Sequence, residues 1–192
     1  ASTGKILKGL PQINENSVSF NLEADSLNAS ILGLHATPDT EEFQLFIKEC
    51  VKEITIKAGQ KCTAVRRIIV PEDLIDEVQQ AISNKLEKIK IGDPAIEGVR
   101  MGALVSRLQV ERVRESVLTL EKSQKIVSGD IDNIDIQGGN KDLGAFFAPI
   151  LFRNEDPFNK VACHDIEAFG PVSTIMPYKD LNEAIELAKM LQ

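Results

Sequence analysis

The sequence predicts an α/β fold in which a largely parallel sheet is flanked by helices. Short apolar segments typical of strands alternate along the chain with longer segments in which apolar residues recur every three or four positions. The 192 residues, of which 43% are hydrophobic, suit one domain, or one domain and part of another. We therefore expect an α/β structure with a substantial hydrophobic core.

The first two elements are predicted to be strands. Val18, Phe20 and Leu22 alternate with polar residues, which is the pattern of a half-buried strand. Residues 29–32 form a second, shorter strand candidate.

A long amphipathic helix is expected next. Asp39 and Glu42 have the spacing of a capping box, so we expect the helix to start there and to end near residues 58–59. Its buried face is predicted from residues three and four positions apart, namely Phe43, Phe46, Ile47, Cys50, Val51 and Ile54.

The middle of the chain predicts a strand and two helices. Residues 67–70 form a short apolar strand that Pro71 ends, and Pro71 also suits the first turn of a following helix. After a turn at residues 92–94, Ser106 is expected to cap the next helix. The inward faces are predicted to carry Leu74, Ile75, Val78, Ala81, Ile82 and Ile89 in the first helix, and Val110, Val113 and Val117 in the second.

The last third of the chain predicts further strands and a final helix. Residues 125–128 form a strand candidate, and the Gly-, Asp- and Asn-rich residues 129–145 are expected to form a surface loop. Extended structure resumes at residues 146–152, and residues 172–176 form the last strand candidate. Asp180 is expected to cap a helix whose apolar face carries Ala184, Ile185, Ala188 and Leu191.

Composition excludes several classes of function. The net charge of −7 argues against a broad basic surface for nucleic acid, and no apolar run approaches the roughly 20 residues that span a bilayer. Residues 1–5 lack the apolar segment of a signal peptide.

Three scattered cysteines argue against a disulfide framework, so we expect a cytoplasmic location. Two histidines are too few and too poorly spaced for a zinc site, and no metal is expected.

Cys62 is the candidate nucleophile. It follows a helix end at Gly59, which permits unusual backbone angles, and small neighbours leave its sulfur accessible. The alternative is a small apolar residue at a buried turn. Cys50 lies on an apolar helical face and is interpreted as a core residue. Cys163 beside His164 offers a thiol that imidazole could activate, although adjacent residues rarely face each other.

Four ordered motifs resemble those of the NAD(P)-dependent aldehyde dehydrogenases. Gly-Gln-Lys-Cys at residues 59–62 resembles the segment that carries the family's nucleophile, and Glu-Ala-Phe-Gly-Pro at residues 167–171 resembles its Glu-x-Phe-Gly-Pro segment. Between them, residues 92–94 and 101–105 resemble the family's Gly-Asp-Pro and Gly-Pro-Leu-Ile segments. The resemblance implies the aldehyde dehydrogenase catalytic-domain fold.

The resemblance also implies a role for each matching residue. Cys62 would attack the aldehyde, and Glu23 would be the general base that activates water, with Asp25 as the alternative base. Glu167 would hold the nicotinamide ribose of NADP or NAD, and Phe169 would pack beside it. The chain departs from the family at residues 24–26, where Ala-Asp-Ser replaces Leu-Gly-Gly.

A narrower resemblance concerns the substrate. Residues 22–28 and 57–71 are similar to the dehydrogenase part of the bifunctional ring-opening enzymes of phenylacetate degradation. That similarity implies a CoA-linked semialdehyde substrate, and the resemblance to the whole family implies a homo-oligomeric parent protein. A CoA-acylating aldehyde dehydrogenase and a catalytically silent structural module are the alternatives.

The organisation of the chain is expected to be that of a fragment. Residues 1–33 are predicted to be a remnant of the cofactor-binding domain with a crossing strand, and residues 34–192 the nucleophile-bearing catalytic domain, truncated at its end. We expect the isolated fragment to be inactive.

Overall fold

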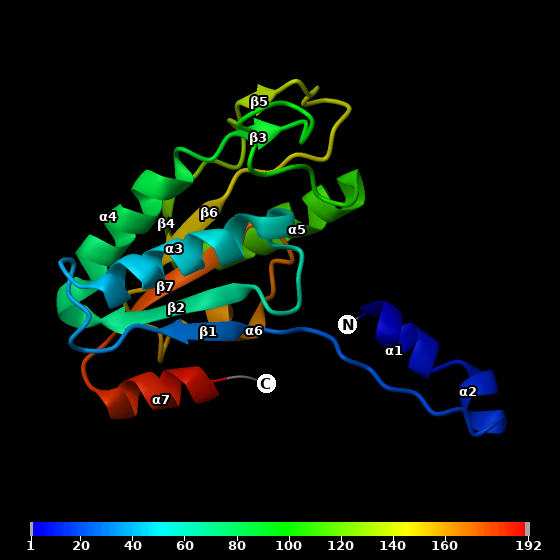
Figure 1. Ribbon diagram of the computed structural model, residues 1–192. Coiled ribbons are helices and arrows are strands. Elements are labelled where there is room, and N and C mark those ends of the chain that lie inside the picture. The colour runs from blue at the N-terminus through cyan, green and yellow to red at the C-terminus, as the bar shows by residue number, and fades with distance from the viewer. Residues whose placement is uncertain (1, 191–192) are drawn as a thin grey trace.

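The computed structural model describes residues 2–190 and consists of three layers, with a five-stranded sheet between two sets of helices (Figure 1). The strand order is β1-β2-β7-β6-β4, and these strands comprise Asn28–Ile31, Val65–Pro71, Val172–Tyr178, Ile150–Arg153 and Lys125–Ser128 respectively. The first four strands in this order are parallel, and β4 is antiparallel to β6. The predicted α/β fold with a largely parallel sheet is therefore confirmed.

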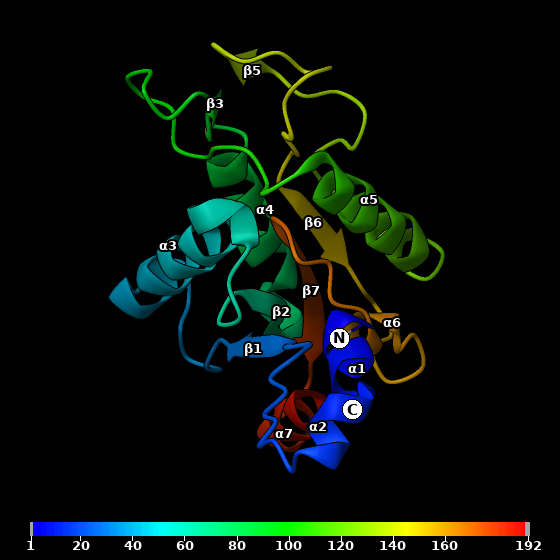
Figure 2. The ribbon, with the colours of Figure 1, turned by 90° about the vertical axis from the view of Figure 1, so that its right-hand side faces the viewer.

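Helices cover both faces of the sheet. Figure 2 shows α3 (Glu41–Thr55) and α4 (Ile75–Leu86) on one side, and α5 (Arg107–Glu121) and α6 (Ala162–Asp165) on the other. The final helix, α7 (Leu181–Lys189), packs into the same core as α5.

Alternation along the central strands divides the core between the two faces. In β2, Ile68 and Val70 pack with α3 and α4, whereas Ile69 packs with the core on the α5 side. Neighbouring β7 alternates in the same way, because Ile175 belongs to the first core and Met176 to the second. Successive side chains of a strand point to opposite faces, so a strand covered on both faces is apolar throughout.

Helix α3 begins at a different cap from the one predicted. Thr40 has extended backbone angles, and its hydroxyl accepts a hydrogen bond from the Phe43 N–H at 3.3 Å. Asp39 instead accepts a hydrogen bond from the Thr37 hydroxyl at 2.6 Å. Asp39 lies one residue before the cap position and does not bind the N–H groups of the first turn. The predicted Asp39 cap is therefore wrong, while the buried face of the helix is confirmed, with Phe46 half-buried at its margin.

Pro71 ends β2 and does not begin the next helix. It pairs with Tyr178 in β7, and a 3₁₀ turn over Glu72–Leu74 separates it from α4. The predicted caps of α5 and α7 are confirmed, because the Ser106 hydroxyl accepts from the Gln109 N–H, and Asp180 accepts from two N–H groups of α7.

The predicted face of α7 is only partly correct. Ala184, Leu187 and Ala188 follow i, i+3, i+4 spacing and pack into the core. Ile185, one position after Ala184, is turned away from that face and is 47% exposed. Leu191 lies outside the described residues.

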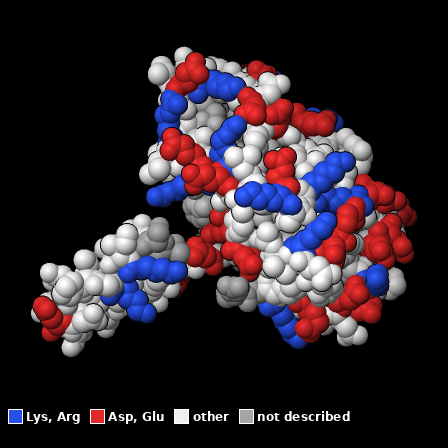
Figure 3. Space-filling view, turned by 180° about the vertical axis from the view of Figure 1, so that it is seen from behind, with Lys and Arg blue, Asp and Glu red and all other residues white. Residues whose placement is uncertain are grey.

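The amino-terminal segment forms two short helices that stand apart from the sheet. They are α1 (Ser2–Lys8) and α2 (Pro11–Glu15), and Figures 1 and 3 show them as a separate lobe at the end of an extended segment. The strand predicted for residues 18–22 is wrong, because no neighbouring strand pairs with this segment among the described residues and Val18 is 49% exposed. The division at residue 33 stays a prediction.

A small second sheet lies beyond the main one. It pairs β3 (Ile91–Gly92) with β5 (Ile136–Gln137), so the segment 129–145, predicted to be loop, contains one short strand. Figure 3 shows acidic side chains interspersed with basic ones over the face it displays. No helix within residues 2–190 has the length and apolar character needed to cross a membrane.

Candidate active site

Cys62 lies in a turn just before β2, at the amino-terminal edge of the sheet. Strands β1 and β7 run parallel to β2, so Ser26 and Glu167, which precede those strands, lie at the same edge. Ligands of open α/β sheets usually bind at the carboxyl ends of the strands. The candidate site of this chain therefore occupies the less common edge.

The turn before Cys62 has a constrained backbone. The 3₁₀ turn over Ile56–Gly59 that follows α3 contains three consecutive residues with positive φ, which are Lys57 at 52°, Ala58 at 50° and Gly59 at 68°. A Cβ atom at Gly59 would lie 2.1 Å from the carbonyl oxygen of Gly170. Glycine is required at position 59 because two backbone segments meet there without room for a side chain.

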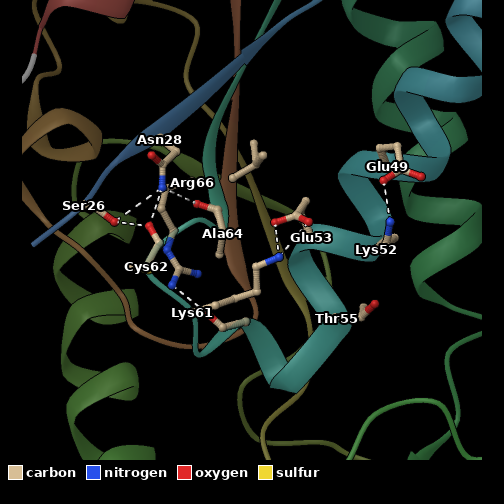
Figure 4. Close-up of polar contacts among 12 residues, drawn as sticks. Ser26, Asn28, Glu49, Lys52, Glu53, Thr55, Lys61, Cys62, Ala64 and Arg66 are labelled. Atoms are coloured by element: carbon tan, nitrogen blue, oxygen red, sulfur yellow. Dashed lines mark hydrogen bonds and ion pairs between the residues drawn. The ribbon is translucent and has the colours of Figure 1, made fainter.

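The backbone carbonyl of Cys62 is held by two side chains, those of Ser26 just before β1 and of Asn28 at its first position. The Ser26 hydroxyl donates to it, and the Asn28 Nδ2 group donates to it at 2.6 Å and to the Ala64 carbonyl at 3.2 Å (Figure 4). On the other side of the turn, Lys61 pairs with Glu53 of α3 at 2.7 Å. The turn is thus anchored on both sides, while Cys62 itself is exposed and does not fit the buried-turn alternative.

A cavity of about 810 Å³ opens in front of this turn. It brings together the four predicted site residues and the alternative base Asp25. The lining residues are Glu23, Ala24, Asp25, Ser26, Cys62, Gln109, Arg112, Ser116, Glu167 and Phe169.

Two carboxylates reach the cavity from the segment before β1. Glu23 is exposed and accepts a hydrogen bond from the Asn21 Nδ2 group at 2.9 Å. Asp25 has φ 62°, in the left-handed region that glycine favours and aspartate tolerates. The family pattern has glycine where Asp25 stands, so the departure in sequence is compatible with a left-handed backbone at this position.

Glu167 is the most buried carboxylate of the site. Its side chain is 11% exposed, and burial raises the pKa of the carboxyl, an effect that nearby Asp25 reinforces and that Arg66 opposes. Its Oε1 atom is buried and lacks a hydrogen-bond partner among the described residues. Beside it, Phe169 is 37% exposed, and the Arg66 guanidinium lies 5.8 Å from its ring centroid.

Three lining residues of α5 were not anticipated from the sequence. Gln109, Arg112 and Ser116 follow helical spacing and face the cavity, and the Gln109 amide also donates to the Phe169 carbonyl at 2.9 Å. Their only sequence signal is a polar helical stripe, which equally describes an ordinary solvent-exposed face.

The other two cysteines have structural surroundings. Cys50 is buried in the core, as predicted, and burial raises the pKa of its thiol to about 12. Cys163 contacts the Asn154 amide at 3.2 Å, whereas the two ring nitrogens of His164 face Arg67 at 3.1 Å and the Pro157 carbonyl at 3.0 Å. The Cys163–His164 pair is therefore not arranged as a nucleophile and base.

Metal coordination has no candidate within residues 2–190. No three side chains of the His, Cys, Asp and Glu types are placed to hold an ion together.

Comparison with known sequences identifies one family. The sequence profile of the "Aldehyde dehydrogenase family" matches residues 6–191. A 3,4-dehydroadipyl-CoA semialdehyde dehydrogenase from Aromatoleum evansii is 39% identical over 98% of this chain. A 3-succinoylsemialdehyde-pyridine dehydrogenase from Pseudomonas is 30% identical over 78% of it. The chain spans 37% and 30% of the lengths of these two relatives.

Solved structures agree with the sequence comparison. Betaine aldehyde dehydrogenase from Staphylococcus aureus in complex with NAD+ superposes with a TM-score of 0.81 at 26% identity, covering 99% of this chain and 35% of that one. An aldehyde dehydrogenase C variant from Pseudomonas syringae, in complex with NAD+ and octanal, has a TM-score of 0.77 at 25% identity, covering 99% and 37%. This chain belongs to the aldehyde dehydrogenase family.

Proposed function

We propose that this chain carries the nucleophile-bearing site of an NAD(P)-dependent dehydrogenase that oxidises an aldehyde to the acid. The observation that carries the proposal is the convergence of Cys62, Glu23, Glu167 and Phe169 on one cavity. These residues come from three separate segments of the sequence. A thiol can serve as the nucleophile, an exposed carboxylate as the general base, and a buried carboxylate beside an aromatic ring as a cofactor contact.

The residues present fit a nicotinamide cofactor. The buried Oε1 atom of Glu167 lacks a hydrogen-bond partner among the described residues, so it can accept from a ribose hydroxyl. Phe169 presents a partly exposed ring beside this carboxylate. When bound, the oxidised nicotinamide supplies a hydride acceptor for the aldehyde carbon.

The covalent step belongs to Cys62. Its thiolate attacks the aldehyde carbon, a C–S bond forms, and the carbonyl oxygen becomes an oxyanion of a thiohemiacetal. When this carbon loses its hydride, the oxyanion electrons re-form the C=O bond and leave a thioester on Cys62. Accessibility of the thiol is a precondition for this step, and Cys62 is exposed in the cavity.

Hydrolysis completes the cycle. Glu23 accepts a proton from water, the resulting hydroxide attacks the thioester carbon, and the C–S bond breaks to release the acid and the Cys62 thiolate. Asp25 lines the same cavity and is the alternative base.

We propose a CoA-linked semialdehyde as substrate because the relative with 39% identity is named as a dehydrogenase of such a compound.

The test uses the complete protein that contains this chain. NADH and NADPH formation with a CoA-linked semialdehyde and with a simple aldehyde is compared for wild type, Cys62→Ala and Glu23→Gln. We expect Cys62→Ala to lose turnover and Glu23→Gln to give a single burst of reduced cofactor followed by slow hydrolysis. Full activity of Cys62→Ala would contradict the mechanism, and acyl-CoA rather than acid as product would favour the CoA-acylating alternative.

Three broader expectations accompany this proposal. The 192 residues alone are proposed to be inactive, because they span only 37% of the length of the relative that is 39% identical. All three cysteines are free, in keeping with the cytoplasmic location that we propose. The complete protein is proposed to assemble as a homo-oligomer.

A further inference from the structure

We propose that Arg66 is a positioning residue that locks the Cys62 turn to the Glu167 segment, so that cofactor and nucleophile are held in one fixed relation. This inference rests on the proposed function, in which Glu167 holds the ribose of the cofactor and Cys62 attacks the aldehyde.

The hydrogen bonds of Arg66 join two segments that are far apart in sequence. Its Nη2 atom donates to the Gly59 carbonyl at 2.6 Å, and its Nη1 atom donates to the Gly170 carbonyl at 2.5 Å. Gly59 begins the turn that leads to Cys62, and Gly170 follows Glu167 and Phe169 directly. The two glycines also lie close together, because a Cβ atom at Gly59 would be 2.1 Å from the carbonyl oxygen of Gly170.

The charge of Arg66 acts on the same segment. Its Nη2 atom lies 3.8 Å from the Oε1 atom of Glu167, and its guanidinium faces the Phe169 ring. Arg66 is only 4% exposed, so this attraction is weakly screened by solvent. A rigid planar guanidinium suits the task, because its donors are fixed in direction and bind two carbonyls while its charge lies near the carboxylate.

The geometry leaves the carboxylate available for a ligand. The Glu167 Oε1 atom has the charge of Arg66 nearby but accepts no hydrogen bond among the described residues. Arg66 therefore orients Glu167 and favours its ionised form, while a lone pair remains free for a hydroxyl donor.

The experiment compares Arg66→Met and Arg66→Lys in the complete protein, with Arg114→Met as the matched control. Arg114 pairs with Asp132 on the surface and has no contact with the cavity. Dissociation constants for NAD+ and NADP+ are titrated by fluorescence, and thermal unfolding verifies the fold. We expect Arg66→Met to weaken cofactor binding about tenfold or more, Arg66→Lys to restore part of it, and Arg114→Met to change nothing.

A pH series separates positioning from simple structural damage. The charged groups at Glu167 are Arg66 and Asp25, and Glu23, Cys62 and Arg112 line the same cavity. Arg66 lowers the pKa of Glu167 against the effect of burial, so its removal should shift the acid limb of cofactor binding to higher pH. Arg66→Lys should retain most of the wild-type pH profile because it keeps the positive charge.

Each outcome decides a separate claim. A folded Arg66→Met variant with wild-type cofactor affinity and pH profile would overturn the positioning role and leave the proposed function intact. If Arg66→Met does not fold, Arg66→Lys decides the claim, and wild-type affinity of this variant for both cofactors would overturn the positioning role. A wild-type protein that binds neither cofactor would overturn the proposed function, and this inference with it.

Discussion

Cys62 differs from the other two cysteines of the chain in the property that governs thiol chemistry, which is access to solvent. Cys62 is exposed in the cavity, whereas Cys50 and Cys163 are buried and burial raises the pKa of both thiols. The thiolate is the reactive species, so burial suppresses both its formation and its encounter with a reagent. Reactivity in this chain should therefore concentrate at one sulfur.

Selective alkylation tests this expectation. Brief iodoacetamide treatment of the native chain should label the Cys62 peptide first, with Cys50 and Cys163 labelled only after denaturation in urea. Mass spectrometry of the digested protein measures the three peptides separately. Labelling of Cys163 at the rate of Cys62 in the native state would show that the site has been misassigned.

The side-chain amide of Asn28 is expected to stabilise the turn that carries Cys62. It donates to the carbonyls of Cys62 and Ala64, so Asn28→Ala removes two hydrogen bonds that anchor the nucleophile turn. We expect a loss of about 1–2 kcal/mol in the free energy of unfolding, measured by urea titration. Asn84→Ala is the control, because Asn84 only pairs with Gln80 on an exposed helical face, and it should change stability little.

At the scale of the element, the amino-terminal cap of α3 is a different residue from the one predicted. Asp39 and Thr40 are both good cap types, and spacing alone favoured Asp39. The backbone decides, because Thr40 is the residue that immediately precedes α3 with extended angles. Thr40→Ala should cost about 1 kcal/mol in thermal or urea unfolding. Asp39→Ala should have a much smaller effect, and the reverse order would contradict this cap assignment.

Arg67 of β2 and His164 of α6 form a buried hydrogen-bond network that also includes α7. Arg67 donates to carbonyls of α7 and to the Leu27 carbonyl, and faces the His164 Nδ1 atom. With Nδ1 facing a permanent donor, the neutral ring carries its proton on Nε2 and donates to the Pro157 carbonyl. Burial lowers the pKa of His164 below the ordinary value of 6.5, and the positive charge of Arg67 lowers it further.

The sign of the resulting pH dependence follows from linkage. Because the pKa of His164 is lower in the folded state, the unfolded chain binds the proton more readily. The contribution to stability is therefore fully present above about pH 6.5 and is lost as the pH falls through the folded pKa. His164→Gln should flatten this loss in unfolding experiments between pH 7 and pH 5. His35→Gln, at an exposed loop position, should keep the wild-type slope.

At the scale of the whole molecule, apolar periodicity predicted the layers well. The short apolar strands, the long α3 helix and the Ser106 and Asp180 caps all depend on local patterns, which sequence records directly. The predicted strand at residues 18–22 failed for a non-local reason, since a strand requires a partner and none lies beside it among the described residues. Alternation describes a surface that can be buried, but it does not supply the neighbour that buries it.

In the candidate site, too, local motifs predicted some features, whereas others depend on contacts between distant segments. Cys62, Glu23, Glu167 and Phe169 were predicted from motifs, whereas their convergence on one cavity depends on the parallel order of β1, β2 and β7. Arg66 had no signal beyond a charge beside an apolar strand, although its side chain touches both halves of the site. Gln109 and Arg112 were likewise hidden in a polar helical face.

In the proposed reaction, Cys62 carries the substrate carbon as a thioester. The most direct measurement is mass spectrometry of the complete Glu23→Gln protein, quenched in acid after one turnover with aldehyde and NAD(P)+. We expect a mass increase equal to the acyl group, located on the Cys62 peptide and absent without cofactor. An unmodified Cys62 during active turnover, or the acyl group on another residue, would contradict it.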